Sequence, residues 1–467
     1  MADELKTLEA AIESIAVAAR QFGLDFFPVR FEICPADVIY TFGAYGMPTR
    51  FSHWSFGKAF HRMKIQYDYN LSRIYELVIN SNPCYAFLLE GNSIVQNKLV
   101  IAHVLAHCDF FKNNATFRHT SRTMLDTMAN SAERIRQMEF EYGRHTVEKI
   151  IDAAISLQEH VDARATIGKP RHNKQDKSIK AEKCPGPYED LLKLGEPESI
   201  IPLVTGEAEK PLPEKDLLKF IIEHAKHLTD WQREVLAIIR EEMLYFYPQM
   251  ETKIMNEGWA SYWHARIMRE IDLTEEEAVE FAITHSAVIQ PARMSLNPYF
   301  IGYKIWENIE RRWEHPEVKE RKEFGLSGGE GRSKMFEVRE NENDVSFIRN
   351  YLTPELIEEL DLYIYQKVGN TWQIVEKNAE KIRDNLVLSL NNCGFPYLEA
   401  VDSDYNRNGE LLVQHCHEGI DLDLLYLERT LPSVYTLWGR TVHLATVMDG
   451  KKVIFSYNGE RVAKASQ

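Results

Sequence analysis

Two short stretches of this sequence place metal-binding side chains at helical spacing. His103 and His107 lie four residues apart in an apolar run, and residues four apart on an α-helix lie one above the other. Both imidazoles can therefore face the same ion. Glu257 and His264 lie seven residues apart in a second apolar stretch, again on one helical face. Because zinc accepts imidazole nitrogen and carboxylate oxygen, these residues predict a divalent metal site, with zinc as the expected ion.

Three of these residues satisfy the ligand count of a catalytic zinc site, which leaves one position open for water. The predicted ligands are His103, His107 and Glu257. His264 lies two helical turns beyond Glu257, and we expect it to donate a proton or to stabilise a transition state. Nearby polar side chains can orient the ligands through hydrogen bonds: Asn256, Ser261, Asp109 and Asn114.

The residue after the first histidine argues against ordinary zinc-peptidase chemistry. Zinc peptidases with two histidines at this spacing carry a glutamate base there, and this chain has Val104. A metal-bound water would need another base, and the nearest candidates are Glu90, Asp109 and His264. Three interpretations follow: a hydrolase with a different base, a metal site without catalysis, and a buried polar cluster that holds no metal.

The histidine helix is preceded by a strand and a capping signal. Residues 85–90 are strand-like, and Ser93 or Asn92 can cap the helix that follows. A strand at the edge of a sheet could hold an extended substrate beside the metal, because its backbone groups are open to pairing. A strand in the middle of the core is the alternative interpretation.

Residues 1–80 are predicted to form a helical and aromatic segment that packs on the core. Apolar residues recur at helical spacing in residues 4–21. Residues 45–61 are rich in aromatic residues, glycine and histidine, and they include His53. This composition predicts an irregular structural loop rather than a ligand site, since buried histidines usually just form hydrogen bonds.

Residues 81–320 are predicted to form a mainly helical core that holds the metal site. Two packed helices are expected in residues 121–161, divided near Gly143. The second motif lies in a helix over about residues 250–271, and Thr274 starts a capping box for the next helix, which carries His285. Three connections are expected: a lysine-rich surface loop at residues 167–187, an ordered loop at 290–302, and a flexible one at 327–334.

Residues 346–467 are predicted to form a small C-terminal α+β module. Thr353 and Pro354 are a typical helix start, and Asp449 with Gly450 indicates a hairpin turn. Five strands are expected at residues 386–390, 397–401, 410–415, 441–446 and 452–457, with a helix near residues 422–437. The predicted fold class is α+β, with a mainly helical, zincin-like core.

Composition limits the classes of function. The chain has 467 residues and a formal net charge of −15, which argues against a general nucleic-acid binder. It starts with acidic residues instead of a secretory signal, and no apolar run reaches membrane-spanning length, so we expect a cytoplasmic protein without a membrane span. Six cysteines are scattered without a close pair, so we expect reduced thiols.

Four aromatic-rich segments give the chain a resemblance to the SpoVR family (stage V sporulation protein R). They are YGMPTRFSHWSFGK at residues 45–58, HVLAHCDFFKNN at 103–114, MNEGWASYWH at 255–264 and LNPYFIG at 296–302. The resemblance covers almost the full length. It implies a cytoplasmic bacterial protein linked, in spore formers, to assembly of the spore cortex peptidoglycan, and a broader stress or envelope role in bacteria that do not sporulate. It implies no particular catalytic activity. The segment with Asn256 and Glu257 also looks like the glutamate helix of gluzincin peptidases.

Our leading hypothesis is a sporulation-associated metal-dependent hydrolase that acts on an amide bond, with a peptidoglycan precursor or a protein as its partner. The alternative is a scaffold or regulator of cortex assembly or stress response, in which the His and Glu cluster is structural. The sequence does not determine the oligomeric state.

Overall fold

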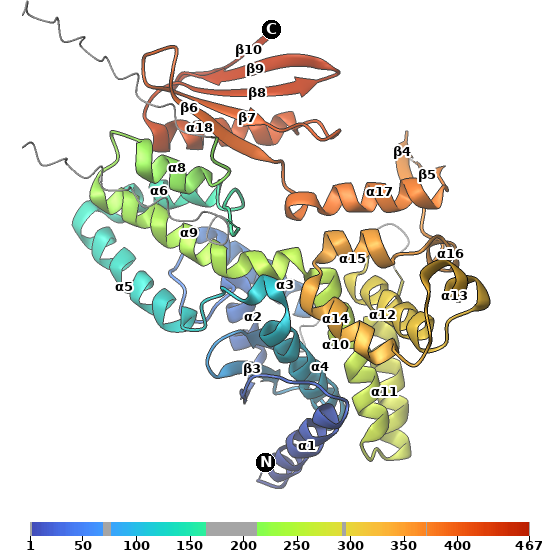
Figure 1. Ribbon diagram of the computed structural model, residues 1–467. Coiled ribbons are helices and arrows are strands. Elements are labelled where there is room, and N and C mark those ends of the chain that lie inside the picture. Colours follow the sequence, from blue (N-terminus) through green and yellow to red (C-terminus); the bar gives the residue numbers. More distant parts are fainter. Residues whose placement is uncertain (1, 69–75, 165–212, 292–295, 370, 467) are drawn as a thin grey trace, which may run out of the picture.

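The computed structural model describes residues 2–68, 76–164, 213–291, 296–369 and 371–466. The predicted lysine-rich loop at 167–187 lies outside the described residues. The prediction of a mixed α+β fold is confirmed: a mainly helical body is joined to a C-terminal β-sheet (Figure 1).

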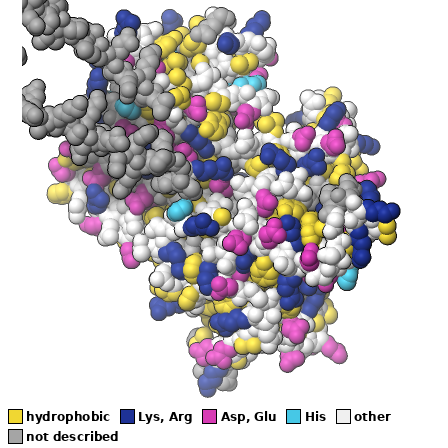
Figure 2. All heavy atoms as spheres, viewed as in Figure 1, with side chains coloured by type: hydrophobic (Ala, Val, Ile, Leu, Met, Phe, Trp, Pro, Cys, Tyr) yellow, Lys and Arg dark blue, Asp and Glu magenta, His cyan; other side chains and the backbone are white. Residues whose placement is uncertain are grey.

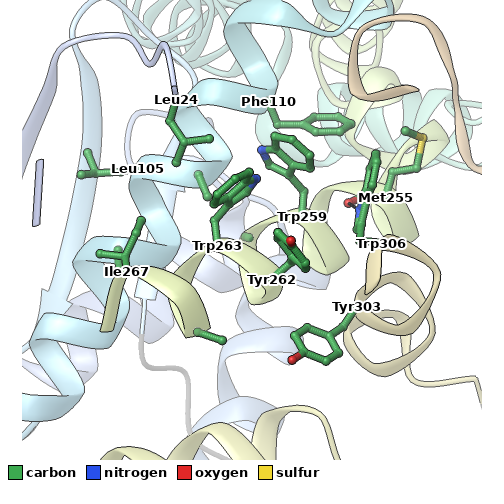
Figure 3. Packing of buried hydrophobic residues seen from close by; sticks show 14 of the residues in the cluster. Leu24, Leu105, Phe110, Met255, Trp259, Tyr262, Trp263, Ile267, Tyr303 and Trp306 are labelled. Atoms are coloured by element: carbon green, nitrogen blue, oxygen red, sulfur yellow. Dashed lines mark hydrogen bonds between the residues drawn. The ribbon is translucent and has the colours of Figure 1, made fainter. Parts of the chain in front are cut away.

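Two buried helices form the centre of the helical body. Helix α4 (Ile94–Asn113) packs against α10 (Lys253–Glu270), and α12 (Pro298–Glu314) packs against the other side of α10. Aromatic rings fill these contacts, as Figure 3 shows: the ring centroid of Trp259 lies 4.9 Å from that of Trp306. The same hydrophobic core includes α1 (Ala2–Gln21), α14 (Gly331–Asn341), α15 (Asp344–Tyr351), α16 (Pro354–Glu359) and α17 (Ala379–Leu390).

A three-stranded sheet precedes the histidine helix. Its strands are β1 (Val29–Cys34), β2 (Glu76–Ile79) and β3 (Cys84–Leu89), in the order β1-β3-β2. The strand predicted at residues 85–90 is therefore confirmed as β3. It pairs with β1 on one side and β2 on the other, so its backbone cannot bind a substrate as an edge strand. The core-strand interpretation was the correct one.

A second hydrophobic core joins four helices to the C-terminal sheet. The helices are α5 (Met124–Tyr142), α6 (Arg144–Ile155), α8 (Leu217–His224) and α9 (Asp230–Glu251). Gly143, with φ 84°, separates α5 from α6, as predicted. The sheet has the order β10-β9-β8-β7-β6, and α18 (Leu424–Trp438) connects the parallel pair β7 and β8. Its strands are β6 (Leu398–Tyr405), β7 (Glu410–His415), β8 (Val442–Met448), β9 (Lys451–Tyr457) and β10 (Val462–Ser466).

Several predicted elements were wrong. Residues 386–390 lie in α17, not in a strand, because Asn378 caps a helix that runs through them. Part of the loop predicted at residues 45–61 is helical, since α3 (Trp54–Asp68) begins directly after His53. The predicted connection at 327–334 ends early, because α14 begins at Gly331. The elements that were not predicted include α2 (Ala36–Tyr45), α13 (Val318–Phe324), and the hairpin of β4 (Ile364–Val368) and β5 (Thr371–Glu376).

The two hydrophobic cores run across the predicted domain limits. The first extends from α1 to α17, so residues 346–390 pack with the helical body. The second unites residues of α5 to α9 with the C-terminal sheet. The division into residues 1–80, 81–320 and 346–467 stays a prediction.

The distribution of charged side chains and the character of the helices both agree with the composition. Basic and acidic side chains are interspersed over the face shown in Figure 2. Among the helices that the structure describes, none combines the length and apolarity needed to cross a membrane.

Candidate metal centre

Helix α4 carries two histidines toward α10. The helix begins with a capping box in which Ser93 Oγ accepts from the backbone N–H of Gln96, and Gln96 Oε1 accepts from that of Ser93. The helix that begins at this cap runs without a break through His103 and His107, so the two side chains lie on one face. Their ring centroids lie 4.6 Å apart, and both side chains are almost fully buried.

Glu257 of α10 completes a cluster with the two imidazoles. Its Oε2 atom lies 3.7 Å from Nε2 of His103 and 3.5 Å from Nε2 of His107. Tetrahedral zinc holds such ligand atoms about 3.3 Å apart, so a small movement would bring all three onto one ion. The three residues form the one group of potential metal ligands found within the described part of the chain, with ligand atoms within 4.8 Å of one another.

The carboxylate of Glu257 lies where a cation is expected. Oε2 is buried and accepts no hydrogen bond of good geometry from a described residue. Desolvation raises the pKa of the Glu257 carboxyl, but N–H groups and positive charge on the facing imidazoles of His103 and His107 outweigh desolvation and hold that pKa well below its usual range; where both Nε2 atoms instead carry lone pairs, a bound cation would supply the positive charge. The side chain is 20% exposed, compared with 3% and 6% for the two histidines, so Glu257 is the most accessible member of the cluster.

Hydrogen bonds behind the cluster select the nitrogen that faces it. Nδ1 of His107 lies 2.8 Å from Oδ1 of Asn256, which only accepts, so Nδ1 carries the proton and Nε2 keeps its lone pair for the cluster. Asn256 therefore has the orienting contact that its place beside Glu257 predicted. The Tyr299 ring, from the first turn of α12, lies parallel to the His103 ring at 6.1 Å between centroids.

A chain of histidines supports His103. Its Nδ1 lies 2.8 Å from Nδ1 of His264, and Nε2 of His264 lies 2.8 Å from Nδ1 of His285. Burial and the neighbouring histidines lower the pKa of His264 well below its usual value, and burial with Arg269 lowers that of His285 to about 4. Both rings are therefore neutral at neutral pH. If each donates one N–H along the chain, Nε2 of His103 keeps a lone pair toward Glu257.

Comparison with known proteins confirms the family resemblance that the four aromatic-rich segments indicated. Residues 2–395 match the family model described as "SpoVR like protein", and residues 396–449 match the one described as "SpoVR-like C-terminal domain". The chain belongs to the SpoVR family. The histidine and glutamate helices both lie in the first match, and β6, β7, α18 and β8 lie in the second.

A curated relative is described as uncharacterized. It is "Uncharacterized protein YcgB" of Escherichia coli (strain K12), 29% identical over 474 residues, which cover 94% of this chain and 91% of the relative. No solved structure matches the chain.

The three bases predicted for the SpoVR chain lie in very different surroundings. Asp109 is fully buried, and both its oxygens lie 2.8 Å from Nη1 of Arg339; it also accepts from Trp259 and from the backbone of Asp25. Glu90 is exposed after β3 and before α4, and His103 lies about 13 Å further along the axis of that helix from its start at Ile94. His264 contacts His103 directly, but both its nitrogens are engaged. The structure thus brings His264 to the cluster and places Asp109 and Glu90 elsewhere.

Other residues of the site were predicted in part or not at all. Ser261 Oγ is buried on the face of α10 that carries Glu257 and His264, without a hydrogen-bond partner among the described residues. Asn114 binds the backbone of Arg339 and Glu342 instead of a ligand. His285 was given no role from sequence, although the capping box at Thr274 fixed the helix that carries it. Its 21-residue separation from His264 gave no local spacing signal.

Proposed function

We propose that this SpoVR-family protein binds a divalent metal ion, zinc in the first instance, through His103, His107 and Glu257. The observation that carries this proposal is the position of Glu257 Oε2, 3.5 Å and 3.7 Å from two imidazole nitrogens and without a good hydrogen-bond donor. Two histidines and one carboxylate form the ligand set of several catalytic zinc sites. Asn256 and His264 hold the histidines in the orientation that such a site needs.

For the reaction, we propose hydrolysis of an amide bond in a peptidoglycan precursor, in the cytoplasm. A bound zinc ion would polarise the scissile carbonyl and lower the pKa of a bound water. The partial exposure of Glu257 supports access of a substrate to this side of the cluster. The biological setting is supported by membership of the SpoVR family, because the resemblance to that family implies a role in formation of the spore cortex.

A second candidate function is supported by the surroundings of the predicted bases. Val104 is fully buried and cannot take part in proton transfer, and Asp109 is held in an ion pair with Arg339. If neither Val104 nor Asp109 can act as a base, the metal would hold α4 and α10 together in a scaffold or regulator of cortex assembly or stress response. In that case the metal contributes folding free energy instead of catalysis.

Elemental analysis of protein purified without a histidine tag tests the metal site. We expect one equivalent of zinc per chain, either as isolated or after reconstitution, and its loss in His103→Ala. Absence of metal under both conditions would show that the cluster is only a set of buried polar side chains.

Glu257→Gln separates the two candidate functions, with Glu270→Gln, at an exposed position of the same helix, as the control. For a hydrolase, Glu257→Gln should fold, bind zinc weakly and release no amine from peptidoglycan precursors in a mass-spectrometric assay. A wild-type protein that binds zinc and cleaves none of them, together with an unstable Glu257→Gln variant, would support the scaffold.

A further inference from the structure

A cavity of about 530 Å³ lies between the helical body and the C-terminal sheet. Its walls come from the end of α9, the first turns of α10, α12 and α15, and the segment between α17 and β6. None of His103, His107 and Glu257 lines it. Its volume is within the range of small-molecule sites, so it is large enough for a ligand of its own.

Two lysines give the cavity an excess of positive charge. The Nζ atom of Lys215 lies between two aromatic rings, 5.4 Å from the centroid of Tyr247 and 5.2 Å from that of Tyr397. It donates to the Tyr247 hydroxyl at 3.2 Å. Among the described residues, neither Lys215 nor Lys253 forms an ion pair with a carboxylate. Desolvation lowers the pKa of Lys215 by more than the carboxylates of Asp162 and Glu251 raise it.

The acidic side chains of the cavity are already engaged. Glu251 pairs with Arg164, the third cationic residue of the lining. Asp344 accepts from the backbone N–H groups of Ile254 at 2.8 Å and Met255 at 2.9 Å, one bond to each carboxylate oxygen. Each carboxylate is therefore engaged by other donors, and neither forms an ion pair with Lys215 or Lys253.

Part of the wall is aromatic, and it is held by an unusual turn. Asn392, Cys393 and Gly394 all have positive φ, at 49°, 58° and 82°. The Asn392 side chain stabilises the turn by donating to the carbonyl of Phe395 at 3.0 Å and by accepting from the Tyr247 hydroxyl at 3.3 Å. Left-handed non-glycine residues cost free energy and cluster at functional sites. Here they place Phe395 and Tyr397 in the cavity wall.

We propose that this cavity binds a small organic anion, a phosphate or carboxylate group joined to an aromatic or apolar body. The anionic group contacts Lys215 and Lys253, and the body packs against Phe395 and Tyr397. A lysine ammonium is a compact donor suited to either anion. The site is separate from the metal cluster, and the proposal stands whether or not the chain binds zinc.

Binding of three small probes to the full-length, metal-free protein tests the proposal. Phenyl phosphate and benzoate carry the two anionic groups, and benzyl alcohol is the neutral control. Probes of this size are expected to bind with a Kd on the order of 5 mM, measurable by ligand-detected NMR titration. At least one of the two anions should bind at least about tenfold more tightly than benzyl alcohol, because a charged contact to lysine exceeds 1.4 kcal/mol. The anion that binds identifies the phosphate or the carboxylate as the recognised group.

Lysine variants show whether binding occurs in this cavity. Lys215→Met should weaken the bound anion at least about tenfold, whereas Lys215→Arg should keep most of the affinity. Lys219→Met is the matched control, since Lys219 is paired with Glu214 and does not line the cavity. If Lys215→Met fails to fold, Lys253→Met, at an exposed position, should weaken binding in its place. The proposal is overturned if neither anion binds better than benzyl alcohol, or if the lysine variants of the cavity bind as the wild type does.

Discussion

Gly258 and Gly302 face each other where α10 crosses α12, with no space for a side chain on either. A Cβ atom on Gly258 would lie 2.3 Å from the carbonyl carbon of Gly302, and one on Gly302 would lie 2.1 Å from the carbonyl oxygen of Ile254. Both neighbours are backbone and cannot turn away. The close approach of these helices holds Tyr299 of α12 against His103 and sets the wall of the metal cluster beside Glu257.

Gly258→Ala should therefore destabilise the protein, although alanine favours helix. Forcing a methyl group into this crossing should cost about 1–3 kcal/mol or more, in spite of a helix-propensity gain of about 1 kcal/mol. Urea unfolding measures this loss. Gly57→Ala is the control, because a Cβ atom at Gly57 in α3 meets nothing within 4 Å, and this variant should be as stable as the wild type or more so. Equal stability of both variants would mean that the crossing is loosely packed.

Asp109→Asn should lower the free energy of unfolding by about 3–5 kcal/mol, because it leaves the guanidinium of Arg339 buried without its counter-ion. This result would assign Asp109 a structural role instead of a catalytic one. Asp37→Asn, which breaks the exposed pair with Lys64, should change stability by less than about 1 kcal/mol. A stable Asp109→Asn protein that binds zinc and has lost hydrolytic activity would instead restore Asp109 as the base.

His285→Leu should weaken zinc binding although His285 is not a proposed ligand. Loss of its ring leaves His264 without the acceptor that fixes its tautomer, and removal of such outer contacts typically costs about 10- to 100-fold in metal affinity. Competition with a chromogenic zinc chelator measures the effect. His415→Leu, which removes an equally buried histidine bonded to Thr446 in the C-terminal sheet, should keep wild-type affinity. The same affinity in both variants would show that the histidine chain does not orient His103.

The stability of the metal-free protein should depend on the protonation of Asp344. Desolvation raises the pKa of Asp344 to about 7, against the lowering effect of two backbone N–H donors. The folded state thus holds this proton more tightly than the unfolded state, so the contribution of Asp344 to stability is fully present below about pH 4 and is lost as the pH rises to about 7.

Asp344→Asn removes this titration and isolates it from other groups. Between pH 4 and pH 8, the stability of the variant should rise relative to wild type by up to about 4 kcal/mol, at roughly 1.4 kcal/mol per pKa unit. The variant is also expected to lose some stability equally at every pH, because the amide nitrogen of asparagine cannot accept a hydrogen bond from the backbone N–H of Ile254 or Met255. Denaturant unfolding at several pH values measures the difference, and a difference that does not vary with pH would show that Asp344 titrates as an ordinary aspartate.

Local sequence patterns were sufficient to predict features that depend only on residues within one or two helical turns along the chain. The capping residues Ser93 and Thr274, the break at Gly143 and the hairpin at Asp449 were all predicted from a few adjacent positions. The helical spacing of His103 and His107 likewise placed both on one face. The spacing of residues along a helix determines the face on which each side chain lies, so it indicated which side chains of each motif could act together.

Tertiary structure decided everything that depends on contacts between distant segments. The aliphatic residues 386–390 resemble a strand locally, but their packing against the helical body makes them part of α17. Only the packing of α4 against α10 showed that Glu257 faces both histidines. The packing of two further helices showed that Arg339 of α14 holds Asp109 and that His285 supports His264. These pairs are separated by 21 to 230 positions. At such distances along the chain, no local periodicity determines which side chains meet, because hydrophobic packing of whole helices brings them together.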